Sequence, residues 1–297
     1  MSTVAVVAHA GKSFGGGLVE LRRELEKQGV ADPLWFEVPK SRKAPKHVKR
    51  ALAEGADLLF VWGGDGMVQR CIDALSDSRA TIAIVPAGTA NLFASNLEIP
   101  QDIEEAVRIG LEGVRRTLDV GRMNDERFAV MAGAGFDAQM IKDADGGLKD
   151  HFGRLAYVWT GTKQLGRKPF GAKIKVDGAT WFDGQASSVL IGNVGKLFAG
   201  VEAFEDARPD DGKLELGVVT ADGLLEWTRT IARTAVGSSS ASPFVQVTKA
   251  TSVQVKFDRK ILYELDGGDR KAVKKLNVEI EPSAITVCVP TTTTDRP

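Results

Sequence analysis

DLLFVWGGDG, residues 57–66, is the stretch that decides the fold of this chain. Its first six residues form a short apolar run that is followed by glycines, which predicts a buried strand. A helical pattern of apolar residues begins near Met67 and continues to Leu75. We therefore expect the glycines to lie at a strand-to-helix turn, as in an α/β protein with a parallel sheet.

A turn of this kind favours a bound anion such as a phosphate group. The backbone N–H groups and the helix N-terminus attract negative charge, and glycine lets a ligand approach the backbone closely. We expect Gly63, Gly64 and Gly66 to line a phosphate site, with Asp65 beside it to act on a metal, a cation or a donor group. A Gly-Gly turn with an Asp helix cap is the purely structural alternative.

A second segment strengthens the interpretation as a binding site. Residues 81–85 are another apolar run, and they are followed by PAGTANLFA at 86–94. Gly88, Thr89 and Asn91 thus come directly after a second predicted strand. Two neighbouring strand ends of this type predict one ligand site at the carboxyl edge of a parallel sheet.

The loop after the first predicted strand, residues 4–8, reaches the same edge. Gly11-Lys12-Ser13 imitates the end of a P-loop, but the required earlier glycine is Val6 here, so this is not a Walker A site. His9, Gly11 and Lys12 are predicted phosphate contacts. A flexible turn is the alternative for this loop.

The pattern changes along the chain from alternating strands and helices to strands separated by Asp-Gly turns. We predict an α/β nucleotide-binding domain over 1–122, a β-rich substrate domain over 123–283, a last strand near 284–290 and a disordered tail at 291–297. The first domain's predicted strands are 4–8, 34–38, 57–62 and 81–85, and its helices are 18–28, 45–54, 67–75 and 103–112. The second domain's predicted strands are 127–131, 172–176, 187–192, 213–219, 253–257 and 260–265, with helices near 154–165 and 224–235.

Composition excludes several classes of protein. The 39 basic and 39 acidic residues balance, which predicts no nucleic-acid partner. No apolar stretch approaches the length of a membrane span, and the apolar start is too short for a signal peptide. Cys71 and Cys288 are expected to be buried thiols in a reducing cytoplasm.

One local run is strongly basic, with Lys40, Arg42, Lys43, Lys46, Lys49 and Arg50. Such a run attracts anionic lipid headgroups, by roughly 1 kcal/mol per basic residue near a membrane surface. A solvated helix face is the commoner explanation and the one that the sequence favours.

The motifs together resemble the catalytic domain of diacylglycerol kinases and related bacterial lipid kinases, sphingosine kinases and, distantly, NAD kinases. The matching pieces are GGDG (63–66), PAGTAN (86–91), LDVGRMNDERFAVMAGAGFDA (118–138), ARPDDGKLEL (207–216) and ELDGG (264–268). The resemblance implies an α/β N-terminal domain with a parallel sheet and a mainly antiparallel second domain, with the last strand returning to the first domain. GAGFDA (133–138) also fits a loose dinucleotide fingerprint, but its context argues against a dehydrogenase.

The resemblance implies an ATP-dependent lipid kinase that meets its lipid substrate at the membrane surface, as a peripheral protein. A homodimer is one assembly to expect. It also implies a structural Mg²⁺ held by Asp211 and the carbonyl groups of Arg208 and Lys213, and such hard oxygen ligands suit this ion.

The chain departs from the family pattern at the expected site. Gly268 replaces the glutamate of the family's D-G-E, which is its presumed catalytic base. Leu92 replaces the acid that follows the asparagine in the family, and Met67 replaces a hydroxyl residue that faces the phosphate. Asp269, one residue further on, is the predicted substitute for the base, acting with Asp65. The alternatives are a nucleotide- or lipid-binding member with little or no activity, and a soluble-substrate kinase related to NAD kinase.

Overall fold

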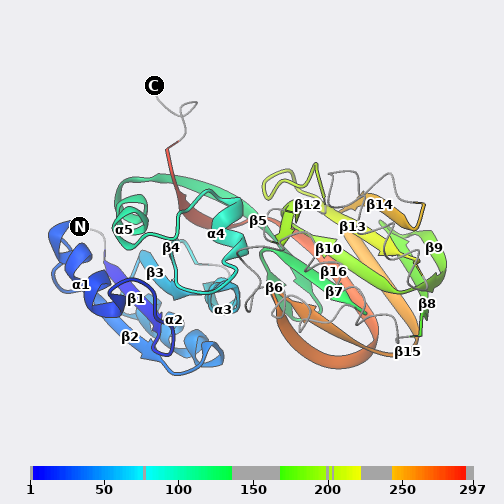
Figure 1. Ribbon diagram of the computed structural model, residues 1–297, viewed down its shortest axis with the longest axis horizontal. Helices are drawn as coiled ribbons and strands as arrows, with labels where there is room; N and C mark the ends of the chain where they lie inside the picture. The colour runs from blue at the N-terminus through cyan, green and yellow to red at the C-terminus, as the bar shows by residue number, and fades with distance from the viewer. Residues whose placement is uncertain are drawn as a thin grey trace, which may run out of the picture. The chain divides into compact units, whose positions relative to one another are not determined.

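The computed structural model describes residues 3–75, 78–135, 168–198, 201–202, 204–221 and 243–291. The chain divides into two compact units (Figure 1). The first unit comprises Met1–Val120 with Pro282–Pro297, and the second comprises Gly121–Glu281. Strands β5 (Val114–Met123) and β16 (Gly268–Val289) contribute residues to both units.

The first unit is built on a parallel sheet with the strand order β2-β1-β3-β4. The sequence predicts these strands because each is a short apolar run, and every residue of β3 is buried. The C-terminal part of β16 pairs with β4 in the parallel direction, with Thr286 opposite Thr81. The bounds are β1 (Val4–His9), β2 (Leu34–Val38), β3 (Leu58–Gly63) and β4 (Thr81–Pro86).

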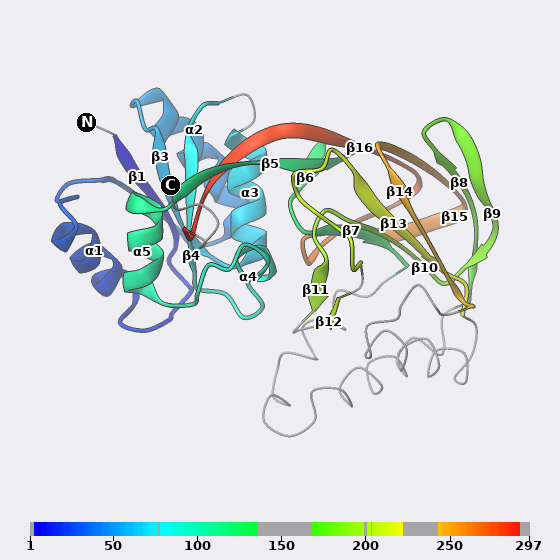
Figure 2. The ribbon, with the colours of Figure 1, turned by 90° about the horizontal axis from the view of Figure 1, so that it is seen from above.

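Helices cover both faces of this sheet (Figure 2). Helices α1 (Gly17–Lys27) and α5 (Ile103–Glu112) pack together on one face, and α2 (Ala44–Ala53) and α3 (Asp65–Leu75) pack together on the other. Two short elements, the 3₁₀-helix η1 (Ser41–Lys43) and α4 (Leu92–Asn96), lie in loops. Helix α5 begins with a side-chain cap, because the Asp102 carboxylate accepts the N–H of Glu105 at 2.8 Å.

The second unit is an antiparallel β structure. Its strands follow the order β14-β13-β10-β7-β15, and β8, β9 and β16 extend the sheet from β15. Alternating apolar residues such as Phe170, Ile174 and Val253 fill its core. The strands are β6 (Glu126–Phe128), β7 (Met131–Ala134), β8 (Phe170–Val176), β9 (Ala179–Ala186), β10 (Ser188–Gly192), β13 (Leu214–Val219), β14 (Val245–Ala250) and β15 (Ser252–Leu265), with the separate pair β11 (Lys196–Phe198) and β12 (Val201–Glu202).

Several local expectations need correction. The two strands predicted at 253–257 and 260–265 are one strand, β15, whose register shifts between Lys256 and Ile261. The strand predicted at 127–131 is divided into β6 and β7. The sequence pattern does not predict strands β5, β9, β11, β12 and β14, the 3₁₀-helix η1 or helix α4, and β16 begins at Gly268 rather than near 284. The helices predicted near 154–165 and 224–235 lie outside the described residues.

Both cysteines are buried free thiols, as the sequence indicated. Burial raises the pKa of Cys288 to about 11, although the nearby guanidinium of Arg115 works to lower it. Burial also raises the pKa of Cys71. Both thiols therefore stay protonated at neutral pH and are not nucleophiles.

Candidate nucleotide-binding site and second-unit hairpin

A single residue, Gly64, connects the end of β3 to the start of α3. Its carbonyl accepts the N–H groups of Met67 at 2.8 Å and Val68 at 3.1 Å, which begins the helix two residues earlier than predicted. The first N–H groups of a helix have no partner within the helix and attract anions. Gly66 is exposed in this first turn, and a Cβ built on it would meet no atom within 4 Å. The space beside residue 66, in the first turn of α3, is therefore open.

The loop after β4 packs against this turn, backbone on backbone. A Cβ on Gly88 would lie 2.5 Å from the Cα of Gly64, and a Cβ on Gly64 would lie 3.0 Å from the Cα of Gly88. The N–H of Ala87 also donates to the carbonyl of Gly63 at 2.9 Å. The two strand ends that the sequence placed at one edge of the sheet are thus in contact, and the contact itself requires glycine at 64 and 88.

Asn91 fixes the shape of the second loop. Its Oδ1 accepts the N–H of Gly88 and its Nδ2 donates to the carbonyl of Gly88, both at 2.9 Å. Its backbone is left-handed, with φ 48°, a conformation that asparagine tolerates better than most residues. Its side chain is buried and holds the loop, while Thr89 is exposed at the loop tip. A direct contact of Asn91 with a ligand stays a prediction.

Asp65 connects two helix starts. Its Oδ1 accepts the N–H of Phe93 at 3.0 Å, so the first residue of α3 is tied to the first turn of α4. A carboxylate at the first position of a helix is also favourable with respect to the helix dipole. Asp65 therefore has a structural role in addition to its predicted catalytic role. Helix α4 starts at Leu92, the position where the resemblance implies an acidic residue.

The loop after β1 lies at the same edge of the sheet. Ala8 pairs with Trp62 of the neighbouring strand β3. The His9 Nδ1 accepts the N–H of Gly11 at 3.1 Å, and the carbonyl of Lys12 accepts the indole N–H of Trp62 at 3.3 Å. The bond from Trp62 holds the loop close to the end of β3, while Gly11 and Lys12 stay exposed.

In the second unit, the family's D-G segment is a tight hairpin turn between β15 and β16. Leu265 pairs with Gly268, and the two residues between them, Asp266 and Gly267, have φ values of 44° and 74°. Positive φ at both turn positions is typical of a two-residue type I′ hairpin, which favours Asp-Gly. The sequence motif is thus explained by the turn.

The Asp266 carboxylate is a buried structural anchor. It accepts the N–H groups of Ala129 at 2.8 Å, and of Val130 and Met131 at 2.9 Å each. These three residues lie between β6 and β7 or at the start of β7. Asp266 therefore satisfies three buried donors, a role that the sequence did not reveal.

Gly268 and Asp269 lie on opposite faces of this hairpin. Gly268 is paired with Leu265, a core residue, whereas Asp269 is paired with Glu264 on the other face. Successive residues of a strand alternate between faces, so a shift of one residue places a side chain on the opposite side. Asp269 is exposed, and its carboxylate does not take the direction that a side chain at 268 would take.

The Asp211 turn, where the resemblance implies Mg²⁺, contains a cation of its own. Lys249 Nζ, on β14, lies 3.2 Å from Glu215 Oε1, 3.6 Å from Asp211 Oδ2 and 3.2 Å from the carbonyl of Asp206. The other oxygen of Asp211 accepts the N–H of Lys213 at 3.0 Å. Both Asp211 oxygens therefore already face a donor, and one of these donors is the Lys249 ammonium, a cation that can take the place of a metal ion. The Mg²⁺ site of Asp211 with the carbonyls of Arg208 and Lys213 stays a prediction. Among the described residues, no group of three or more His, Cys, Asp or Glu is arranged to hold a metal ion.

We expect the melting temperature of the wild-type protein to be the same in millimolar Mg²⁺ and in EDTA. Lys249→Met should lower the free energy of unfolding by roughly 1 kcal/mol, because the largely buried Glu215 loses its charged partner. Calorimetry with and without Mg²⁺ checks both statements. The opposite result would be a wild-type protein that Mg²⁺ stabilises, together with a Lys249→Met variant of unchanged stability. That result would show that Asp211 binds the metal.

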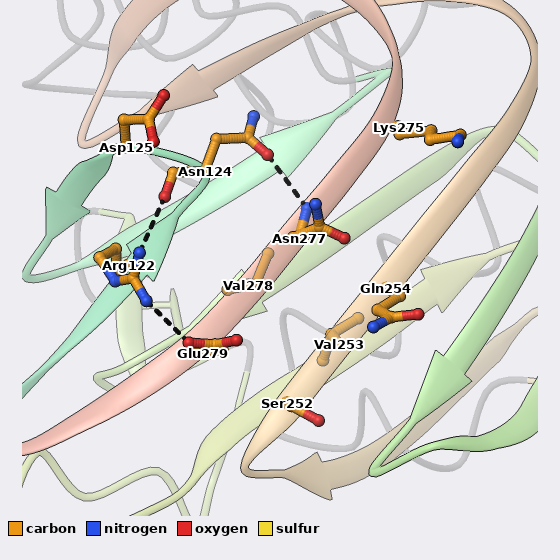
Figure 3. A pocket seen from close by; sticks show the side chains of 10 residues that line it. All are labelled: Arg122, Asn124, Asp125, Ser252, Val253, Gln254, Lys275, Asn277, Val278 and Glu279. Carbon is orange, nitrogen blue, oxygen red and sulfur yellow. Dashed lines mark hydrogen bonds and ion pairs between the residues drawn. The ribbon is translucent and has the colours of Figure 1, made fainter.

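A polar groove in the second unit is separate from these residues (Figure 3). It has a volume of about 760 Å³ and lies over β15, β16 and the turn after β5. Arg122 donates to the Glu279 carboxylate at 2.8 Å and to the carbonyl of Asn124 at 3.3 Å, so its charge is paired inside the groove. None of the predicted site residues is among its described lining.

Comparison with known proteins identifies the family. Residues 3–123 match the family model of the diacylglycerol kinase catalytic domain, and residues 130–289 match that of the YegS C-terminal NAD kinase beta sandwich-like domain. The chain therefore belongs to the diacylglycerol kinase catalytic-domain family, a family of lipid kinases.

Similar proteins of known name agree with this assignment. The diacylglycerol kinase of Bacillus subtilis is 32% identical over 227 residues, which are 74% of this chain and 73% of the relative. That of Staphylococcus carnosus is 29% identical and covers 84% of this chain and 82% of its own length. A solved structure titled as a Bacillus anthracis diacylglycerol kinase covers 99% of this chain and 98% of its own, with a TM-score of 0.74 at 22% identity. The predicted fold class is confirmed.

Proposed function

We propose that this protein is an ATP-dependent kinase that transfers the γ-phosphoryl group of ATP to the hydroxyl of a diacylglycerol-like or other long-chain lipid. The observation that carries the proposal is the contact of Gly64 with Gly88 beside the open turn at Gly66. Backbone groups, rather than side chains, then face an incoming phosphate chain. The names of the relatives support the lipid substrate class.

The residues of the first unit would hold the nucleotide. Backbone N–H groups of 63–66, with the hydroxyl of Thr89, are suited to the phosphate oxygens, because they combine close approach with the N-terminus of α3. Gly88 would shape the site rather than donate to it, because its N–H already donates to Asn91 Oδ1. Gly11, Lys12 and His9 would contact phosphate from the loop after β1. Mg²⁺ bound with ATP would neutralise charge on the phosphate oxygens, and Asp65 is the carboxylate proposed to hold it.

Asp269 is the proposed proton acceptor for the lipid hydroxyl, and a poorly placed one, so we expect slow turnover in the wild-type protein. It is an exposed carboxylate next to the glycine that replaces the family's glutamate. A second function, a nucleotide- or lipid-binding protein with weak turnover, is favoured by one observation. Because Asp269 lies on the opposite face of the hairpin from Gly268, it does not reproduce the position of a glutamate at 268.

We expect Gly66→Leu to reduce the affinity for ATP by about tenfold or more. The new side chain fills the open space at the start of α3, where a phosphate group is proposed to bind. Leucine is a better helix former than glycine, so the melting temperature should stay the same or rise. Isothermal titration calorimetry with ATP and Mg²⁺ measures the affinity.

Ala53→Leu is the matched control, because position 53 is exposed at the C-terminal end of a different helix, α2. This variant should bind ATP like the wild-type protein. Unchanged ATP affinity in a folded Gly66→Leu protein would exclude the assignment of the phosphate site to the start of α3.

A further inference from the structure

Residues 40–53 carry six basic side chains and no acidic one, in a chain whose basic and acidic residues are equal in number. All six are exposed. Within the described part of the chain, Arg50 alone has an ion-pair partner, Glu54, at 2.6 Å. We call this set the basic segment; it comprises Lys40, Arg42, Lys43, Lys46, Lys49 and Arg50.

The basic segment is unfavourable for the helix that carries it. Lys43 is the N-cap of α2, Lys46 is in its first turn, and that turn contains no acidic residue. Cations near a helix N-terminus are destabilising because the dipole is positive there. Lys43, Lys46 and Lys49 are also spaced three residues apart, so their like charges lie close together on one side. An external anion would remove this repulsion.

The basic segment begins at the same edge of the sheet as the glycine loops, and α2 then carries Lys49 and Arg50 toward the opposite edge, where β3 starts. Strands β2, β1 and β3 are parallel neighbours, and Val38 at the end of β2 pairs with His9 at the end of β1. The N–H of Ala10 donates to the carbonyl of Val38 at 2.9 Å. Directly after β2, η1 packs against α3, which starts at Asp65, and α2 lies beside α3 (Figure 1).

We propose that the basic segment docks the protein on an anionic lipid bilayer and so brings the sheet edge with the glycine loops to the lipid surface. This inference rests on the proposed function, because a lipid kinase has to reach a substrate held in a membrane. An extended surface fits better than a single phosphate group. The ten residues of α2 alone span about 15 Å, and an anionic bilayer presents many headgroups over that length.

The test is co-sedimentation with lipid vesicles. The wild-type protein should bind vesicles of phosphatidylcholine with phosphatidylglycerol and should not bind vesicles of phosphatidylcholine alone. The variant Lys43→Gln/Lys46→Gln/Lys49→Gln should lose binding on the order of 100-fold, as three basic contacts predict. Its melting temperature should stay the same or rise, because the helix repulsion is relieved.

Lys256→Gln/Lys271→Gln/Lys274→Gln is the matched control, since it removes three exposed charges from the second unit. It should bind vesicles like the wild-type protein. Equal losses in the two triple variants would overturn the proposal in favour of a general charge effect. A wild-type protein that binds DNA but does not bind anionic vesicles would overturn it in favour of a nucleic-acid partner.

The proposed function is tested separately in the same variants. Activity on a short-chain diacylglycerol that is dispersed as monomers requires no bilayer, so the basic-segment variant should retain it. Loss of vesicle binding with this activity retained is the expected result. A wild-type protein that binds anionic vesicles but phosphorylates no lipid would contradict the kinase proposal and leave the docking proposal standing.

Discussion

Gly268→Glu is expected to raise the rate of lipid phosphorylation by about 10²–10⁴-fold, the usual contribution of a positioned general base. Position 268 carries no side chain, and it is where related lipid kinases place the glutamate. A Cβ there would lie 2.9 Å from Nη1 of Arg270, which pairs with Glu126 and donates to the carbonyl of Gly268, so the new side chain requires Arg270 to shift. Steady-state turnover with saturating ATP measures the effect.

Asp269→Asn is the partner experiment. If Asp269 is already the base, this variant should lose turnover by a similar factor and Gly268→Glu should add little. If the base has been lost, Gly268→Glu should activate the protein and Asp269→Asn should change nothing. The positions of 268 and 269 on opposite faces of the hairpin favour activation. Normal turnover in Asp269→Asn, with no gain in Gly268→Glu, would exclude both explanations of the proton transfer.

Asp266→Ala should lower the free energy of unfolding by roughly 4 kcal/mol or more. The substitution leaves the N–H groups of Ala129, Val130 and Met131 buried without their acceptor. Each lost partner of a buried donor costs about 1–3 kcal/mol. Alanine is also disfavoured at the positive φ of this position. Chemical denaturation measures the change.

Asp266→Gly separates the two causes of this loss. Glycine tolerates the positive φ but still removes the carboxylate, so this variant should also be strongly destabilised. Asp269→Ala is the control for the hairpin, because its exposed side chain has no such role. A loss below about 1 kcal/mol in both Asp266 variants would show that the three N–H groups find other partners.

The sequence predicts the first unit well because its strands are short apolar runs and its turns are rich in glycine. The parallel sheet and the edge that joins His9, Gly63 and Pro86 follow from that pattern. The contact between Gly64 and Gly88 does not, because it depends on how closely two loops approach. A sequence does not distinguish a glycine that allows two backbones to touch from a glycine, such as Gly66, that leaves space for a ligand.

Predictions in the second unit were less complete for a different physical reason. Asp266 and Lys249 take their roles from partners far away in the chain, at residues 129–131 and 206–215. The pair Asp266-Gly267 predicts a turn from local sequence alone, but it does not predict that the carboxylate of Asp266 accepts three distant N–H groups. Likewise, Asp269 looks like a neighbour of the missing base in sequence, but strand alternation places it on the opposite face.

Transfer of labelled phosphate from ATP to a lipid tests the central claim most directly. The wild-type protein with Mg²⁺ should label diacylglycerol, or another long-chain lipid alcohol in a panel with ceramide and sphingosine, and Gly66→Leu should not reach the wild-type rate at limiting ATP. A protein that binds ATP in calorimetry but labels no lipid in the panel, even as Gly268→Glu, would contradict the assignment as a lipid kinase.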